Sequence, residues 1–241
     1  MQFEEIERSI DISNLTCWYQ PIYDLKKGML LGYETLVRSK IKNGPNPMEI
    51  FKRAELLGRH SILDKQLIIK AQELFKCPKN CTLFINIFPS TIMNENFLSW
   101  WDEHPPIVDS IVLEISESEP VSNPDLLKFI LKKLQQRGIK IALDDMGAGY
   151  SSLQRWIELE PDYIKLDKYY IAGIENYTKK QKLLKLLNKL FESSAQIIVE
   201  GVENIEGLKI AKDSGIRYAQ GYLLGRPSPI SNINDSNLSL L

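Results

Sequence analysis

The chain has 241 residues, of which 44% are hydrophobic and 25% are charged, and its formal net charge at pH 7 is -1. This composition is typical of a soluble globular protein, and the near-neutral charge argues against general binding to DNA or RNA. No apolar run reaches the ~20 residues that span a bilayer, and the acidic start MQFEEIERSI is unlike a signal peptide. We therefore expect a cytoplasmic protein without membrane insertion.

Eight segments have the apolar character of strands: residues 17–23, 29–38, 82–87, 111–116, 139–145, 163–167, 196–201 and 218–224. Segments with helical spacing of apolar residues follow the second strand, at 47–57, 61–75, 124–137, 152–159, 179–193 and 203–214. Alternation of this kind predicts a parallel sheet, and eight such strands close most economically into a barrel. The expected fold class is therefore α/β, a (β/α)8 TIM-like barrel.

The first two predicted strands are separated only by the residues DLKKG. This loop is too short for a crossover connection, so these strands must pair antiparallel. No repeat, linker or low-complexity tract interrupts the sequence. We expect one domain over residues 1–241, with the first strand antiparallel and a motif-bearing core at about 17–230.

The cysteines Cys17, Cys77 and Cys81 are odd in number and lack the paired CxxC spacing of a zinc site, so we expect free thiols. The segment KKQKLLKLLNKL is basic and amphipathic, a pattern that also occurs at membrane surfaces and in partner-binding helices. An outer barrel helix needs one apolar stripe and one solvated face, and this segment supplies both. We interpret it as a barrel helix.

Acidic and amide residues lie where the predicted strands end: Glu34, Asn86, Glu114, Asp144, Asp145 and Glu200. Lys165 follows the same rule. Oxygen ligands that converge from strand ends are how a barrel builds a divalent-metal site, and so many carboxylates with one lysine would repel one another without a cation. With only two histidines in the chain, Mg²⁺ or Mn²⁺ is a better fit than zinc. The pattern predicts a metal-dependent active site.

The surrounding motifs, in chain order, are WYQPIYD, GYETLVRS, LEISES, DDMGAGYSS, YIKLDK, VEGVE and AQGYLLGRP. From about Trp18 to about Pro227, their order and spacing resemble the EAL domain family. The resemblance implies a phosphodiesterase that hydrolyses cyclic di-GMP to linear pGpG with two divalent cations, Mg²⁺ or Mn²⁺, and for which Ca²⁺ is expected to be inhibitory. It also implies a homodimer, while any regulatory protein partner stays unknown.

The resemblance also assigns roles to individual residues. It implies metal ligands at Glu34, Asn86, Glu114, Asp144 and Asp145. It implies catalytic residues at Lys165, Glu200 and Gln220, substrate contacts at Gln20, Leu36 and Arg38, and anchors for the loop 146–152 at Glu117 and Glu203. Two alternatives stay open at this point: Lys165 as an outward-facing barrel lysine, and Gln220 as a buried amide that only satisfies backbone groups.

Three positions depart from the family pattern. Thr35 stands where the eponymous motif Glu-Ala-Leu has alanine, and Met146 and Ala148 stand where the family usually has phenylalanine and often threonine. The alternative function is a non-catalytic cyclic di-GMP receptor that signals through a protein partner, although family members of that kind usually lack a metal ligand. A scaffold without a ligand is the weakest reading, because it leaves the carboxylates unexplained.

Overall fold

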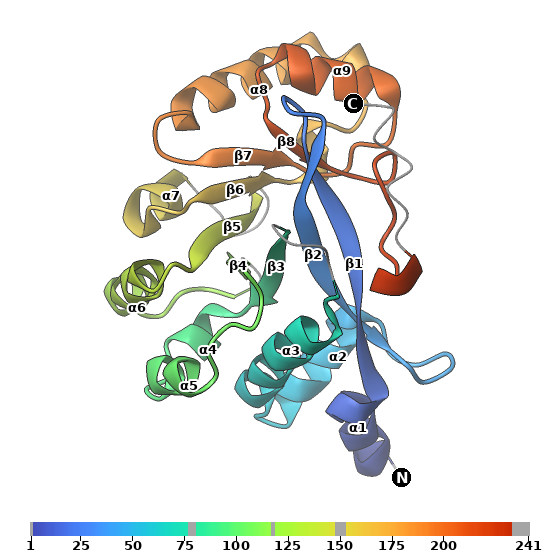
Figure 1. Cartoon of the computed structure of the whole chain (residues 1–241), viewed down its shortest axis with the longest axis vertical. Helices are drawn as coiled ribbons and strands as arrows, with labels where there is room; N and C mark the ends of the chain where they lie inside the picture. Colours follow the sequence, from blue (N-terminus) through green and yellow to red (C-terminus); the bar gives the residue numbers. More distant parts are fainter. Residues whose placement is uncertain (1, 77–80, 117–118, 148–152, 233–241) are drawn as a thin grey trace.

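A computed structural model of the chain describes residues 2–76, 81–116, 119–147 and 153–232. In these ranges, eight strands close into a barrel in the order β1-β2-β3-β4-β5-β6-β7-β8. β1 pairs antiparallel with both β2 and β8, and each later pair of neighbours is parallel. The predicted barrel with an antiparallel first strand is confirmed (Figure 1).

The strands are β1 (Leu15–Asp24), β2 (Met29–Ser39), β3 (Thr82–Ile87), β4 (Ser110–Ile115), β5 (Lys140–Met146), β6 (Tyr163–Leu166), β7 (Gln196–Val199) and β8 (Tyr218–Gln220). The α-helices are α1 (Gln2–Ile10), α2 (Pro47–Leu56), α3 (His60–Leu74), α4 (Pro89–Ile92), α5 (Phe97–Glu103), α6 (Pro124–Gln136), α7 (Leu153–Leu159), α8 (Thr178–Phe191) and α9 (Ile205–Asp213). Short 3-10 helices are η1 (Ile12–Asn14), η2 (Lys168–Tyr170), η3 (Ile174–Asn176) and η4 (Ile230–Asn232).

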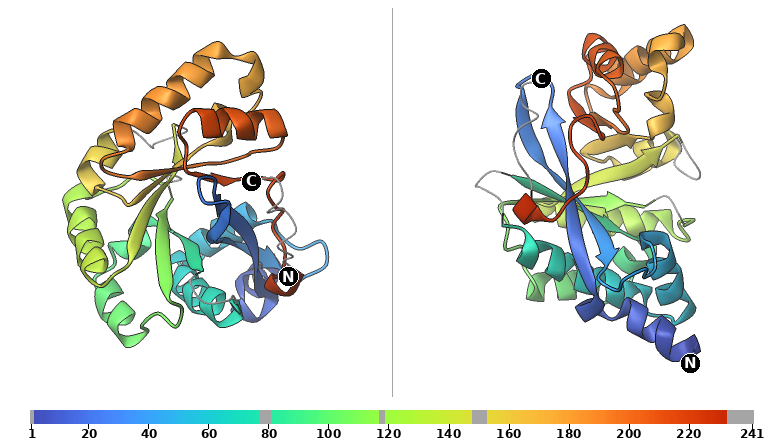
Figure 2. Two further views of the ribbon diagram at one scale, coloured as in Figure 1. Left: turned by 45° about the horizontal axis from the view of Figure 1, so that its top comes forward. Right: turned by 90° about the vertical axis from the view of Figure 1, so that its right-hand side faces the viewer.

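Helices α2 to α9 lie outside the strands and bury apolar side chains toward them, whereas α1 packs against α2 (Figure 2). Asparagine side chains start three of these helices: Asn46 at α2, Asn123 at α6 and Asn204 at α9 each accept a hydrogen bond from a backbone N–H in the first turn. At α2 the cap is reciprocal, because the Glu49 carboxylate accepts from the Asn46 N–H. None of the described helices is long and apolar enough to cross a membrane.

Some elements differ from the sequence prediction. Helices α1, α4 and α5 were not predicted, and β8 ends at Gln220 instead of continuing to residue 224. The chain turns after Gln220 because Gly221 packs directly on the backbone of Val202, where a Cβ would lie only 2.2 Å from the Val202 nitrogen. Cys17 and Cys81 are free, as expected, and Cys77 lies outside the described residues.

An apolar layer fills the interior of the barrel. Tyr163 packs edge-on against Phe84 and Tyr218, with ring centroids 5.5 and 5.9 Å apart. We call this layer the apolar plug; its members are Ile22, Phe84, Val112, Ala142, Tyr163, Ile198 and Tyr218. Because strand side chains alternate with a period of two, residues two positions further along each strand face the same interior. The residues two positions beyond the plug therefore form the next layer inside the barrel.

Candidate active site

A polar layer lies directly above the apolar plug. Six of its members stand two positions after a plug residue on the parallel strands: Asn86, Glu114, Asp144, Lys165, Glu200 and Gln220. Two further members, Gln20 and Glu34, face each other across the antiparallel pair β1-β2. The carboxyl ends of parallel barrel strands meet at one mouth, which is where barrel active sites lie. One residue departs from the predicted position, because β2 runs on to Ser39 and Glu34 lies within the strand, not at its end.

Lys165 is the centre of this layer. Its Nζ atom lies 2.8 Å from Glu200 Oε1, 2.9 Å from Asp144 Oδ1, 3.0 Å from Glu114 Oε1 and 3.4 Å from Glu34 Oε2. Only 1% of the lysine side chain is exposed, so the outward-facing alternative for Lys165 does not hold. Three ammonium protons serve four carboxylates, which leaves an excess of negative charge in a buried place.

The layer has two levels. The deeper level comes from even-numbered strands, with Glu34 on β2, Glu114 on β4, Lys165 on β6 and Gln220 on β8, all of them buried. Asn86, Asp144 and Glu200 come from or just after the odd-numbered strands and are half-buried. Side chains from alternate strands form successive layers in a closed barrel. A substrate that enters from the mouth would therefore meet the upper level first.

A bulge in β5 brings two consecutive aspartates to the same site. In a regular strand, neighbouring side chains point to opposite faces, so only one of Asp144 and Asp145 would face the barrel interior. The pairing of β5 with β6 shifts register between Leu143 and Met146, and Asp145 has a left-handed backbone with φ of 50°. Carboxylate oxygens of Asp144, Asp145 and Glu200 consequently lie within 4.8 Å of one another.

Amide side chains surround the Glu34 carboxylate. Asn86 Nδ2 donates to Glu34 Oε1 at 3.2 Å, and Gln220 Nε2 donates to Glu34 Oε2. Gln220 Nε2 also donates to Gln20 Oε1 at 3.0 Å, and Gln20 Nε2 donates to the Gly225 carbonyl at 3.1 Å. The partners of Gln220 Nε2 are thus side chains of the polar layer and not backbone groups.

Burial and crowding of charge shift the pKa values of the layer. Burial raises the pKa of Glu114 well above its ordinary value, and burial together with Asp144 and Glu34 raises the pKa of Glu200 to about 8. Burial by itself would lower the pKa of Lys165, but the four carboxylates outweigh it and hold the pKa well above its ordinary value. The layer therefore takes up positive charge readily, as a proton or as a cation.

These residues fit divalent cations. Hard cations bind carboxylate and amide oxygens, and the layer presents both. Glu114 Oε2 is fully buried and has no hydrogen-bond partner among the described residues, which a bound cation would correct. Asp144, Asp145 and Glu200 also offer closely spaced oxygens on the exposed side of the layer. The donor set and its uncompensated charge match a metal site.

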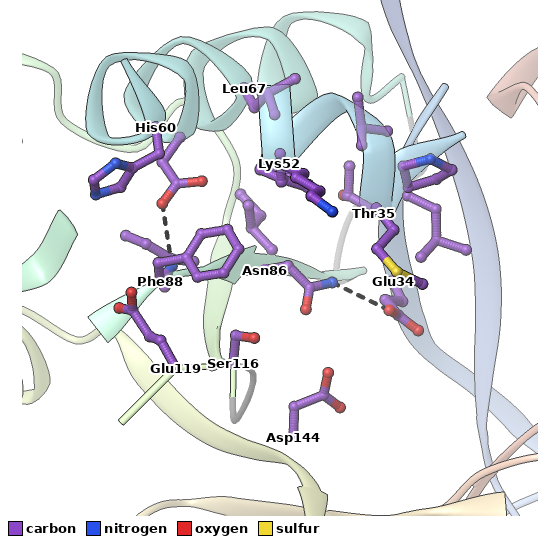
Figure 3. Close-up of a pocket in the computed structure, with 18 of the residues that line it drawn as sticks. Glu34, Thr35, Lys52, His60, Leu67, Asn86, Phe88, Ser116, Glu119 and Asp144 are labelled. Atoms are coloured by element: carbon purple, nitrogen blue, oxygen red, sulfur yellow. Dashed lines mark hydrogen bonds between the residues drawn. The ribbon is translucent and has the colours of Figure 1, made fainter. Parts of the chain in front are cut away.

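A cleft of about 650 Å³ opens beside the polar layer (Figure 3). Asn86 points toward Glu34, and Asp144 faces the same space at one end. Helix α2 forms a side wall with Met48, Phe51 and Lys52. His60, Phe88 and Glu119 line the other end, where Phe88 packs edge-on against Phe51 with ring centroids 5.2 Å apart. The cleft thus has carboxylates of the polar layer at one end and an aromatic wall.

The remaining predicted residues are less closely joined to the site. Leu36 lines the cleft, but Arg38 donates to the Val37 carbonyl and stacks over the Trp18 ring at 5.3 Å. Glu203 is exposed in the loop after β7. Glu117 and residues 148–152, and with them Ala148 and most of the predicted loop 146–152, lie outside the described residues. Of the departures from the family pattern, Thr35 lines the cleft and Met146 is buried in the core.

The residues at the far end of the cleft, Asp64, His60 and Glu119, were not predicted from the sequence. Asp64 was detectable in principle, because it falls on the buried face of α3 with Leu67, Ile68 and Ala71, where a carboxylate is unusual. His60 belongs to no motif, and Glu119 follows the last residue of LEISES without a periodic signal. Their proximity depends on three separate segments meeting in space.

Comparison with known proteins agrees with this geometry. The EAL domain profile matches residues 4–227 of the chain. The chain belongs to the EAL domain family. Over 236 residues it is 30% identical to "Probable cyclic di-GMP phosphodiesterase PdeG" of Escherichia coli K12, covering 93% of this chain and 46% of that protein. The chain spans between about a third and a half of the length of the first curated EAL relatives.

Solved structures of EAL proteins share the fold. An EAL domain protein of Listeria monocytogenes EGD-e superimposes with a TM-score of 0.83 at 24% identity, covering 100% of this chain and 97% of that one. The manganese and cyclic di-GMP complex of Klebsiella pneumoniae BlrP1 has a TM-score of 0.77 at 27% identity, covering 89% of this chain and 56% of that one. Divalent-metal binding at the acidic layer is consistent with both the EAL fold and this relative.

Proposed function

We propose that this chain is a metal-dependent phosphodiesterase that hydrolyses cyclic di-GMP to linear pGpG. The observation that carries the proposal is the buried Lys165 ammonium within 3.4 Å of four carboxylates at a barrel mouth, beside an open cleft. Two relatives support the same substrate and cofactor. The curated Escherichia coli relative is named a probable cyclic di-GMP phosphodiesterase, and the related Klebsiella protein was solved with manganese and cyclic di-GMP.

The proposed ligands for two divalent cations are Glu34, Asn86, Glu114, Asp144 and Asp145. Glu200 belongs with them on geometric grounds, because its carboxylate lies within 4.8 Å of both aspartates. Such cations, when bound, offset charge on a phosphate and make water a stronger nucleophile at neutral pH. The polar layer supplies oxygen ligands at two depths, which suits ions that must contact both the protein and a phosphodiester.

Lys165 keeps the carboxylates of the layer in one arrangement. Without its ammonium, four acidic groups at the base of the mouth would repel one another and separate. One N–H of the ammonium can turn from a carboxylate to a phosphate oxygen or to the attacking water, since four acceptors already compete for three donors. We assign Lys165 this double role of spacing the ligands and donating to the reacting group.

Gln220 is proposed to orient the attacking water. Its Nε2 is held by Glu34 and Gln20, so the amide plane is fixed. Its Oε1 is buried and has no hydrogen-bond donor among the described residues. A fixed acceptor beside the ligand layer is suited to hold one water proton and direct the oxygen lone pair toward phosphorus.

The cleft is proposed to hold the dinucleotide. Leu36 and the Phe51–Phe88 wall offer apolar surface for a base. For Gln20 to contact a guanine, its Nε2 group would give up its hydrogen bond to the Gly225 carbonyl and donate to the base instead. Arg38, whose guanidinium lies over the Trp18 ring, is proposed to contact a phosphate. Glu117 and Glu203 stay proposed anchors of the loop that follows Asp145. A cytoplasmic location and a homodimer are further proposals, taken from the sequence and from the family resemblance.

The direct test is to incubate the purified chain with cyclic di-GMP and Mg²⁺, Mn²⁺ or Ca²⁺ and to separate the nucleotides by chromatography. We expect pGpG to accumulate with Mg²⁺ or Mn²⁺. Glu34→Ala serves as the inactive variant, and Glu103→Ala, at an exposed glutamate of α5, as the matched control. Tight binding of cyclic di-GMP with no product under any metal would favour the non-catalytic receptor instead.

A further inference from the structure

The turn that follows β3 begins two residues after the proposed metal ligand Asn86 and has little regular structure of its own. Asn86 is followed after one residue by Phe88 and by α4, which has only four residues. A helix of one turn does not hold itself, because nucleation costs more than its few hydrogen bonds return. Asn86 itself is paired with Glu114 in the sheet, so this turn acts on Asn86 by fixing how β3 ends, and it also fixes the aromatic wall of the cleft.

A buried carboxylate from α3 holds one side of this turn. Asp64 Oδ2 accepts from the Phe88 backbone N–H at 3.1 Å and from Thr91 Oγ1 at 2.7 Å. The Asp64 side chain is only 1% exposed, and no ion pair to it occurs among the described residues. Burying a carboxylate without a cation costs stability unless its hydrogen bonds recover it. These two bonds are what keeps Asp64 in place.

A second carboxylate holds the other side. Glu119 Oε1 accepts from the Ser90 backbone N–H at 2.6 Å, and Glu119 Oε2 accepts from Ser90 Oγ at 3.1 Å. Because the Ser90 hydroxyl proton is used in this way, His60 Nε2, 3.1 Å from Ser90 Oγ, must be the donor of that contact. Arg155 Nη2 on α7 donates to the Glu119 carbonyl at 3.1 Å. Hydrogen bonds thus link the turn directly to the segments that follow β2 and β4, and through Glu119 to α7, which follows β5.

We propose that Asp64 and Glu119 are positioning residues for the metal site, which hold the turn from Phe88 to Thr91 so that Asn86 stands beside Glu34. This inference rests on the proposed function, since it takes Asn86 as a ligand. Among the described residues, the hydrogen bonds of both carboxylates go to backbone and hydroxyl groups of the turn and not to the polar layer. Partners that orient ligands in this way typically contribute about 10–100-fold to metal affinity.

The test measures Mn²⁺ binding by titration calorimetry and backbone hydrogen exchange, so that it does not depend on hydrolysis. Asp64→Ala and Glu119→Ala are each expected to weaken Mn²⁺ binding about 10-fold or more and to speed exchange at the Phe88 and Ser90 amides. Asp64→Asn should restore both properties, because both bonds end on a single oxygen, which the asparagine carbonyl can replace.

The matched control is Gln72→Ala. Gln72 is also buried on α3, and its Oε1 accepts from the Ile107 backbone N–H at 2.9 Å, near the opposite end of the helix. It should lower thermal stability without changing Mn²⁺ binding. Equal loss of Mn²⁺ binding in Gln72→Ala and Asp64→Ala would overturn the proposal, as would faster exchange in the turn with unchanged binding. A parent chain that binds Mn²⁺ but hydrolyses nothing would contradict the proposed function alone.

Discussion

Lys165 Nζ and Glu114 Oε1 lie 3.0 Å apart although their strands, β6 and β4, are not neighbours in the barrel. Both side chains point inward from alternate strands at one depth, and neither reaches solvent beyond 1%. Loss of the Lys165 ammonium would leave the buried Glu114 without its cation, whereas loss of Glu114 would leave Lys165 with three other carboxylates. The pair therefore joins the stability of the barrel to the chemistry proposed for its mouth.

Lys165→Met is expected to lower the stability of the metal-free protein by about 3–5 kcal/mol, the usual cost of breaking a buried ion pair. Divalent cations should recover part of this loss, since they replace the ammonium as the source of positive charge. Thermal unfolding with and without Mg²⁺ measures both effects. Lys189→Met, at an exposed lysine of α8, is the control and should change neither curve. Equal melting temperatures for Lys165→Met and the parent chain would refute the central role of Lys165.

Glu34→Ala should reduce turnover by more than about 100-fold, because deletion of a direct ligand exceeds the usual effect of an outer partner. The fold should persist. Loss of the hydrogen bonds from Asn86 and Gln220 costs about 0.5–1.5 kcal/mol each, and relief of carboxylate repulsion offsets this. Circular dichroism and turnover on the same sample separate the two effects. Near-parental turnover in a folded variant would remove Glu34 from the proposed ligands.

Mg²⁺ or Mn²⁺ should support turnover, whereas Ca²⁺ should support binding of cyclic di-GMP with little hydrolysis. Ca²⁺ is larger, accepts more ligands at longer distances and activates water less. Exhaustive chelation followed by addition of single metals measures this order. Hydrolysis that survives chelation would contradict a metal-dependent mechanism.

Asp64 should make stability depend on pH. Burial raises its pKa from 3.8 to about 7, so the folded chain binds a proton more tightly than the unfolded chain. The stabilisation that protonation of Asp64 contributes to the folded state is fully present below about pH 4 and is lost as pH rises through about 7. Glu119 is the charged group whose field adds to the shift. The melting temperature of the parent relative to Asp64→Asn should therefore fall from pH 5 to pH 8, and a constant difference would contradict this assignment.

Most of the fold was readable from local pattern. Strand alternation with helices predicts a parallel barrel, and the loop between β1 and β2 is short enough to require an antiparallel pair whatever the rest of the chain does. Helix α5, with Trp100 and Trp101 in a seven-residue segment, was missed because it is too short for a periodic signal.

The residue types and spacing of the chain by themselves determined that carboxylates and one lysine gather at a barrel mouth, because strand ends converge in any such barrel. Only the tertiary structure decided how they meet. The bulge that turns Asp145 toward Glu200 is a break in register, and the two carboxylates that hold the turn from Phe88 to Thr91 come from segments far apart in sequence. Both depend on long-range packing, which a local pattern does not encode.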